Sequence, residues 1–147
     1  MQIRLARITE KPELEGLQLR ASLANPGDRE ALLSNPDAID LPEQQIRAGW
    51  TWVADRAGEI LGFAVVVPRA DGDFELEGLF VEPSHWRQGI GKWLVDHCVH
   101  VSKSAGAVAL HVVGNPHASD FYGGCGFTFV ETIATRFGEG LRYRKSL

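Results

Sequence analysis

A strand, a glycine-rich turn and an amphipathic helix follow one another in the middle of this sequence. Residues 74–81 are rich in apolar and aromatic side chains, which favours a strand. Residues 89–104 repeat apolar side chains at helical spacing, so we expect an amphipathic helix there. The sequence Gly89-Ile90-Gly91 stands at the start of that helix. A strand that leads directly into a helix indicates an α/β domain.

Strand and helix patterns also alternate through the rest of the chain. A strand is predicted at residues 2–8, and a helix capped by Thr9 follows it. Residues 50–55 and 59–67 are expected to form a hairpin. The other predicted elements are short helices after Asp28, after Pro42 and at residues 116–123, and strands at residues 107–113, 127–135 and 141–147. This order implies an α/β domain that is built on one mixed sheet.

Length, charge and cysteine usage exclude several classes of protein. The 147 residues contain no repeat and no linker-like segment, so a single domain over residues 1–147 is expected. A net charge of -4 argues against non-specific nucleic-acid binding, and no apolar run of ~18 residues that would span a membrane is present. The N-terminal residues lack the pattern of a secretory signal, and Cys98 and Cys125 form no metal-binding motif. We therefore expect a cytoplasmic protein without a metal.

The turn around Gly89 and Gly91 has the properties of an anion site. Free backbone N–H groups at a helix start attract phosphate, and glycine lets phosphate oxygens approach the main chain. Arg87 and Lys92 add positive charge on either side. The segment is not a Rossmann fingerprint, because Leu94 stands where the third glycine is required, and it is not a Walker loop. Taken alone, the turn leaves open both phosphate binding and an ordinary glycine-rich turn.

The whole segment from Leu76 to Val95 resembles motif A of the GNAT (Gcn5-related) acetyltransferases: a strand, Pro, a basic or Gln position, Gly-x-Gly and a helix. The resemblance implies that main chain around the glycines binds the pyrophosphate of acetyl-coenzyme A, and that the preceding strand binds the pantetheine arm. The matching positions are Arg87, Gln88, Gly89, Ile90, Gly91 and Lys92 for the pyrophosphate, and Leu79, Phe80 and Val81 for the arm. Trp86 departs from the family, which usually has Arg or Gln there, so we expect at most a weakened phosphate contact.

A second segment, from Leu110 to Phe127, resembles GNAT motif B, which reads strand, Asn-x-x-Ala, x-x-Phe-Tyr and x-x-x-Gly-Phe. The matching positions are Asn115, Ala118, Phe121, Tyr122, Gly126 and Phe127, in the family's order downstream of motif A. The resemblance implies that Asn115, Ala118 and Phe121 contact the cofactor. It also implies that the Tyr122 hydroxyl lies near the sulfur of coenzyme A and protonates the departing thiolate. Without the resemblance, Phe121 and Tyr122 would be interpreted as core aromatics.

Acetylation of an amine requires a group that removes a proton from the ammonium, because only a neutral nitrogen attacks the thioester. Glu75 and Glu77 lie two residues apart on the strand before the glycine turn, so they are expected to share a face. The resemblance implies a base role for a glutamate at either place, directly or through water. His111 is open as a proton acceptor or a packed histidine. An acyl intermediate on Cys125 is disfavoured by direct transfer in the family.

The resemblance implies a small bacterial-type GNAT acetyltransferase with one central mixed, mostly antiparallel sheet of about six to seven strands flanked by helices. It further implies that acetyl-CoA is the co-substrate and that a primary amine attacks the thioester directly. The alternatives are a non-catalytic acetyl-CoA-binding sensor and a protein-interaction domain. We expect a small cationic acceptor rather than a protein, in a mouth that residues 26–50 frame and that Asp71, Asp73, Glu75 and Glu77 make acidic. Both a monomer and a homodimer are open.

Overall fold

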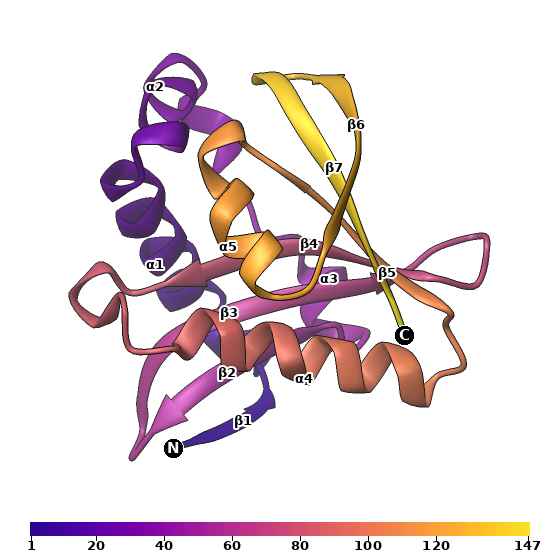
Figure 1. Cartoon of the computed structure of the whole chain (residues 1–147). Coiled ribbons are helices and arrows are strands. Elements are labelled where there is room, and N and C mark those ends of the chain that lie inside the picture. Colours follow the sequence, from indigo (N-terminus) through magenta and orange to yellow (C-terminus); the bar gives the residue numbers. More distant parts are fainter.

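The computed structural model describes residues 1–147 and contains one seven-stranded sheet (Figure 1). The strands are β1 (Gln2–Leu5), β2 (Thr51–Arg56), β3 (Glu59–Pro68), β4 (Phe74–Val81), β5 (Ala109–Gly114), β6 (Thr128–Thr135) and β7 (Gly138–Ser146). Their order across the sheet is β1-β2-β3-β4-β5-β7-β6. Every neighbouring pair is antiparallel except β4 and β5, which are parallel. The prediction of a mixed, mostly antiparallel sheet in an α/β fold is therefore confirmed.

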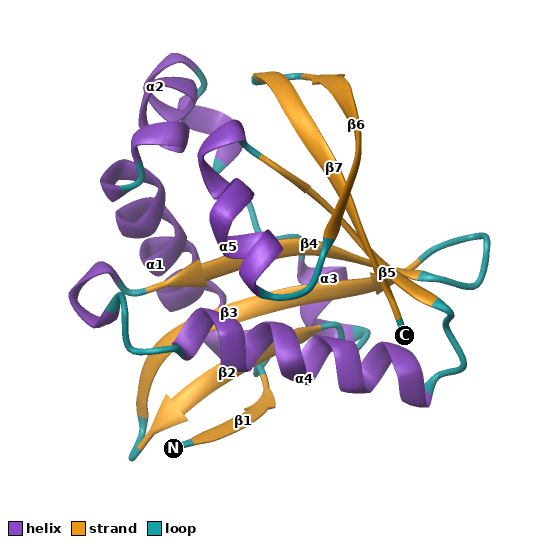
Figure 2. Cartoon of the chain, viewed as in Figure 1, coloured by secondary structure: helices purple, strands orange, loops and turns teal.

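Helices cover both faces of this sheet. They are α1 (Lys11–Ala24), α2 (Pro26–Ser34), α3 (Glu43–Arg47), α4 (Ile90–Ser104) and α5 (Ser119–Gly124), with 3₁₀ turns at Ile8–Glu10, Pro36–Ala38, Pro83–His85 and Pro116–Ala118. Figure 2 shows α4 in front of the sheet and α3 behind it. None of the helices combines the length and the apolar character that crossing a membrane would require.

Successive residues of the hairpin strands β2 and β3 contribute to two different cores. Val53 and Phe63 belong to a cluster with Leu14 of α1. Their neighbours Ala54 and Ala64 belong to a larger cluster that includes residues of α4 and α5. Because side chains alternate between the two faces of a strand, each core lies on its own face of the sheet. This explains why β3 is buried along nearly its whole length.

The N-terminal strand and helix differ from their predicted bounds. The first strand ends at Leu5 and not at Ile8, and α1 begins at Lys11 after a 3₁₀ turn. Glu10 causes this difference, because its carboxylate accepts hydrogen bonds from the Arg7 N–H at 2.8 Å and from both terminal nitrogens of Arg4 at 3.0 and 2.8 Å. These bonds turn the chain before α1. The predicted helix cap at Thr9 is therefore wrong, because Thr9 lies inside the turn.

The two parallel strands separate soon after they begin to pair. The ladder joins Phe74–Leu76 of β4 to Leu110–Val112 of β5 and goes no further. β4 nevertheless continues to Val81 and β5 to Gly114. Beyond the ladder, an opening therefore lies between the two strands. The main-chain groups of each strand that face this opening have no hydrogen-bond partner from the other strand. The opening is the part of the fold that positions the candidate site.

Candidate active site

A β-bulge in β4 stands at the start of the opening. The register of β3 against β4 pairs Val66 with Leu76 and Val65 with Gly78, which leaves Glu77 as the extra residue of β4. A bulge bends its strand and changes the direction of a side chain. Glu77 is exposed and lines the pocket between β4 and β5.

A pocket of about 500 Å³ lies where β4 and β5 separate. Its walls come from the α1–α2 region, from β4, from the end of β5 with the turn after it, and from the β6–β7 turn. Three of its side chains are carboxylates, those of Asp28, Glu77 and Glu139, and one is the imidazole of His117. No Lys or Arg lines it. Such a pocket attracts cationic ligands and disfavours anionic ones.

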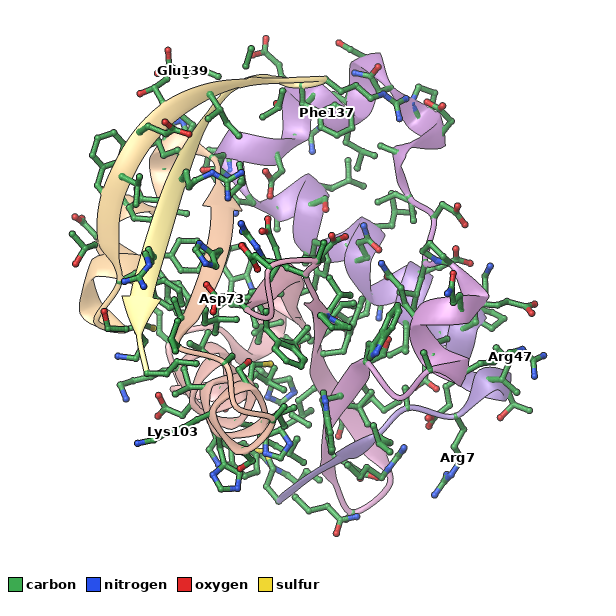
Figure 3. All side chains as sticks on the ribbon, turned by 90° about the vertical axis from the view of Figure 1, so that its right-hand side faces the viewer. Arg7, Arg47, Asp73, Lys103, Phe137 and Glu139 are labelled. Carbon is green, nitrogen blue, oxygen red and sulfur yellow. The ribbon has the colours of Figure 1, made fainter.

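The β6–β7 turn closes one side of this pocket. Arg136 Nη2 donates hydrogen bonds to the two carboxylate oxygens of Asp37 at 2.9 and 3.0 Å, so the turn is joined to the 3₁₀ turn after α2. Phe137 lines the pocket and is 48% exposed. Figure 3 shows Phe137 at this turn, next to the helices of the N-terminal part. The acidic pocket therefore has an aromatic ring at its mouth.

The N-terminus of α4 has the backbone geometry of an anion site. Arg87 and Gly89 both have positive φ, 64° and 80°. Left-handed residues of this kind turn successive N–H groups toward one point, as in anion-binding nests. The hydrogen bond from Trp93 N–H to Gly89 C=O begins the helix, so the N–H groups of residues 90–92 lack a helical partner. A Cβ at Gly89 would meet no atom within 4 Å, which leaves the turn accessible from outside.

Two aromatic side chains connect this turn to the pocket. Trp86, the residue that departs from motif A, donates a hydrogen bond from its Nε1 to the Val81 carbonyl at 2.8 Å. The carbonyl at the end of β4 therefore already has a hydrogen-bond donor within the chain. The ring of Phe121 lies 3.3 Å from the position of a Cβ on Gly91. The Phe121 ring centroid is 5.2 Å from that of Tyr122, which lines the pocket. The α4 turn and the pocket are therefore neighbours.

Tyr122 is buried between the pocket and the larger core. Its ring centroid lies 5.6 Å from those of both Phe127 and Tyr143. Burial, with smaller contributions from Cys125 and Asp28, raises the pKa of Tyr122 well above its ordinary value. Tyr122 is therefore a neutral phenol at physiological pH and can donate a proton or a hydrogen bond. Burial also raises the pKa of the Cys125 thiol, which disfavours the thiolate that an acyl-cysteine route needs.

Asn115 joins α2 to the turn after β5. Its Nδ2 donates a hydrogen bond to Asp28 Oδ1 at 2.8 Å, and its Oδ1 accepts one from the His117 N–H at 2.8 Å. The contact is tight, because a Cβ on Gly27 would lie 2.7 Å from the Asn115 side chain. The sequence predicts that this side chain reaches cofactor amides. In the structure, both of its polar groups have partners within the chain.

The family model of the Acetyltransferase (GNAT) family matches residues 22–127, more than half of the chain. The chain belongs to the GNAT acetyltransferase family. The match spans both motifs, so the resemblance that they carry is confirmed. A sequence comparison with curated proteins found no match.

Solved GNAT structures superpose on nearly the whole chain. A GCN5-related N-acetyltransferase from Rhodopseudomonas palustris has a TM-score of 0.81 at 19% identity, with 99% of this chain and 95% of that chain covered. The PaiA N-acetyltransferase from Thermoplasma acidophilum, in complex with coenzyme A, has a TM-score of 0.78 at 17% identity and coverages of 99% and 98%. An aminoglycoside 6'-N-acetyltransferase complexed with coenzyme A has a TM-score of 0.75 at 18% identity and coverages of 99% and 97%. At these identities the likeness shows the fold alone.

Within this GNAT protein, the residues predicted from the two motifs divide between two places. Leu79, Phe80, Asn115, Ala118 and Tyr122 line the pocket together with Glu77. The main chain of residues 87–92 lies outside the pocket, at the N-terminus of α4. Phe121 lies between the two, as described above. One set thus lines the opening between the strands, and the other lies beside it, with Arg87, Gln88, Gly89 and Lys92 exposed and Ile90 buried.

The acidic residues predicted at the acceptor mouth are separated in the structure. The Glu75 carboxylate accepts a hydrogen bond from Arg69 Nη1 at 2.9 Å and lies 3.7 Å from Arg142 Nη1. Asp71 also pairs with Arg69, at 3.0 Å. Neither Glu75 nor Asp71 lines the pocket. The prediction that four carboxylates form the entrance is therefore wrong, and of the four only Glu77 lines the pocket.

Asp73 stabilises the start of β5 and not the pocket of this acetyltransferase. Its Oδ1 accepts hydrogen bonds from the N–H groups of Val108 and Ala109 at 3.2 Å, and its Oδ2 lies 2.9 Å from His111 Nε2. His111 is therefore hydrogen-bonded within the structure. Figure 3 shows Asp73 well separated from Phe137 at the pocket mouth. The side-chain atoms of Asp71, Asp73 and His111 that could coordinate a metal lie within 4.8 Å of one another. These side chains are already engaged, because Asp73 and His111 make the hydrogen bonds given above and Asp71 pairs with Arg69.

Two parts of the GNAT pocket were not predicted as site residues. The first part is Asp28. In the sequence, Asn25-Pro26-Gly27-Asp28 indicates only the end of one helix and the start of the next. The structure agrees with this, because Asn25 Oδ1 caps α2 by accepting a hydrogen bond from the Gly27 N–H at 3.0 Å. The β6–β7 turn belongs to neither motif A nor motif B; its sequence resembles the closing hairpin of many bacterial GNAT members, and that resemblance implied no site residue. The one available signal was the expectation that residues 26–50 frame the mouth, and residues of α2 and of the turn after it do line the pocket.

Proposed function

We propose that this GNAT protein transfers the acetyl group of acetyl-CoA to a small, cationic primary amine, with residues 1–147 acting as one N-acetyltransferase domain. The observation that carries the proposal is the pocket between β4 and β5, because Tyr122 and three carboxylates line it and no Lys or Arg does. Coenzyme A in two solved structures of the same fold supports acetyl-CoA as the acyl donor. Two buried, unpaired cysteines fit a reducing, cytoplasmic setting.

The proposed acetyl-CoA site extends from the N-terminus of α4 to Tyr122. The main chain of residues 87–92 binds the pyrophosphate, which the free N–H groups and the positive φ of Arg87 and Gly89 support. Arg87 supplies the nearby positive charge, since Lys92 already pairs with Asp96 at 3.0 Å. The pantetheine arm enters the opening beside Leu79–Val81, whose main chain beyond the ladder has no partner from β5. Asn115, Ala118 and Phe121 border the same path.

In the proposed reaction, a neutral amine nitrogen attacks the thioester directly. Main-chain groups of β4 in the opening polarise the thioester carbonyl. Tyr122 is the proposed proton donor to the departing thiolate. Its raised pKa keeps the phenol protonated but also makes it a weaker acid. Donation therefore has to be accompanied by return of a proton to the phenol from the amine nitrogen.

The acceptor is proposed to bind as an ammonium. Glu77, on its bulge, is the β4 carboxylate that faces the acceptor, whereas the ion pairs of Glu75 support a structural role for that residue. Phe137 adds an aromatic ring that can bind a cation on its face. Arg136 makes such a contact, with its Cζ 5.0 Å from the centroid of the Phe137 ring. An acidic pocket with one aromatic side chain fits a diamine or an amino-sugar better than an acidic amino acid.

A thiol-release assay with acetyl-CoA tests this proposal. The panel contains diamines, amino-sugars, glutamate and aspartate at equal concentration. Faster release with the cationic amines is the expected result. Glutamate or aspartate as the far better acceptor would overturn the cationic preference. Binding of coenzyme A without release over the whole panel would overturn catalysis and favour the sensor alternative.

A further inference from the structure

We propose that Asp28 is a catalytic residue of this site and accepts the proton that leaves the acceptor ammonium. This inference rests on the proposed acetyl transfer. It assigns a role to a side chain of α2, an element that neither motif A nor motif B contains.

The position of Asp28 suits a group that touches the acceptor. Asp28 lies in the first turn of α2 and its side chain lines the pocket. Oδ1 accepts the hydrogen bond from Asn115 Nδ2 at 2.8 Å, and this bond fixes the orientation of the carboxylate. Oδ2 has no hydrogen-bond partner in the chain and is available to a ligand.

Asp28 and Tyr122 lie at the same end of the pocket. Asn115 contacts Asp28, and its neighbour Gly114 contacts Tyr122, since a Cβ on Gly114 would lie 2.9 Å from the Tyr122 ring. The charge of Asp28 is also close enough to contribute, after burial and Cys125, to the raised pKa of Tyr122. Removal of the ammonium proton and protonation of the thiolate therefore take place at one location.

The surroundings of Asp28 favour proton uptake. Burial raises the pKa of the Asp28 carboxyl, and the hydrogen bond from Asn115 and the nearby His117 oppose the shift only in part. A carboxylate with a raised pKa is a better proton acceptor near physiological pH. The other titratable side chains that line this pocket are Glu77, Glu139, His117 and Tyr122. None of them is a permanent cation that would pair with Asp28, as Arg69 pairs with Glu75.

Glu77 is less well placed for the same step. It is exposed on the bulge of β4, and no hydrogen bond within the chain fixes its carboxylate. Glu77 therefore attracts and binds the ammonium, and Asp28 removes the proton.

The proton and electron transfers of the step balance. An ammonium N–H proton moves to Asp28 Oδ2, and the freed nitrogen lone pair forms the N–C bond with the thioester carbonyl. The C–S bond breaks, and the thiolate takes the Tyr122 proton. Tyr122 regains a proton from the same nitrogen, which becomes the amide. Asp28 then releases its proton to water.

The test is the pH dependence of turnover for Asp28→Asn, with Glu77→Gln as the matched control. The amide that replaces the Asp28 carboxylate keeps an oxygen for the Asn115 hydrogen bond but cannot take up a proton. With saturating acetyl-CoA and the best amine of the panel, kcat should fall by ~10²-fold or more, and the acidic limb of the pH profile should disappear. Glu77→Gln should raise KM and keep the acidic limb. Titration calorimetry should give an unchanged acetyl-CoA affinity for both variants.

Three outcomes would overturn the inference. Wild-type kcat with an intact acidic limb in Asp28→Asn would exclude Asp28 as the proton acceptor. A rise in KM alone would assign Asp28 to ammonium binding. Absence of thiol release by the wild-type protein with every amine would overturn acetyl transfer itself, and the Asp28 role with it. The first two outcomes require an active wild-type protein, so they leave the proposed function standing.

Discussion

Asn115 and Asp28 stand 87 residues apart in the chain, and a 2.8 Å hydrogen bond from Asn115 Nδ2 to Asp28 Oδ1 joins them. The bond connects the first turn of α2 with the turn that follows β5, so the α2 wall of the pocket is held against the end of that strand. A carboxylate in this partly buried place costs stability when it is charged. Stability and activity are therefore expected to oppose each other here.

The first prediction concerns the stability of Asp28→Asn as a function of pH. Burial raises the pKa of Asp28 in the folded state above its value of about 3.9 in the unfolded chain, so the native carboxyl binds its proton more tightly. Folding stability is then lost as pH rises through the native pKa, because the charged form is disfavoured. The amide of the variant carries no charge and avoids this loss. Thermal unfolding should show a higher Tm for Asp28→Asn at neutral pH and no difference below about pH 4. An equal or lower Tm at neutral pH would contradict the argument.

The second prediction concerns coenzyme A binding at the start of α4. Gly89→Val places a branched side chain on a residue with φ of 80°, where the phosphate has to approach the main chain. Affinity for coenzyme A should fall tenfold or more, about 1.4 kcal/mol. Gly106→Val is the matched control, because Gly106 follows the other end of α4, has φ of 90° and has no atom within 4 Å of its added Cβ. Both variants lose stability, but calorimetry should show weaker binding for Gly89→Val alone. Equal affinity in the two folded variants would refute the pyrophosphate assignment.

The third prediction concerns the hydroxyl of Tyr122. Tyr122→Phe keeps the ring packing and removes the proposed proton donor. Turnover should fall by ~10²-fold or more while acetyl-CoA affinity stays unchanged. The control is Tyr143→Phe, because the Tyr143 hydroxyl is buried without a hydrogen-bond partner and its ring is a neighbour of Tyr122. Loss of that unpaired hydroxyl should leave turnover unchanged and should not destabilise the fold. If Tyr122→Phe turned over at the wild-type rate, water or another group would have to donate the proton.

The fourth prediction separates the two glutamates of β4. Glu77→Gln removes a pocket carboxylate and should raise KM for a cationic amine several-fold, with a weaker dependence of KM on salt. Glu75→Gln should leave KM unchanged, since Glu75 pairs with Arg69 and Arg142 outside the pocket. Initial rates at two salt concentrations measure both effects. An equal rise in KM for the two variants would show that the division by ion pairing is wrong.

Much of the local structure could be predicted from short stretches of sequence. The hairpin of residues 50–55 and 59–67 and the strand at residues 74–81 agree with β2, β3 and β4 to within one residue at each end. Their patterns depend on neighbours in sequence, such as the turn residues at Ala57-Gly58. The N-terminal boundary was missed because the Glu10 carboxylate binds Arg4 and the Arg7 N–H, and no propensity scale contains those contacts.

The carboxylate pattern could not be predicted in the same way. Four acidic residues between Asp71 and Glu77 look equivalent in sequence, and an alternating strand would place Glu75 and Glu77 together. In the structure, Arg142 of β7 approaches Glu75 because β7 pairs with β5 next to β4. Glu77 is the bulge residue of β4, and it is the one member of these four that lines the pocket. These differences depend on strand register and on residues distant in the chain.

The family, the α/β fold and the order of the Gly89-Ile90-Gly91 turn and the Tyr122 segment follow from the sequence alone, because each of these depends on residues close together along the chain. Which side chains line the pocket depends instead on how distant segments pack. Asp28 reaches the pocket only because α2 packs against the end of β5, and Phe137 lies at its mouth only because the β6–β7 turn is held to Asp37 by Arg136. Contacts of this kind are set by the packing of distant segments, and short-range sequence patterns do not specify them.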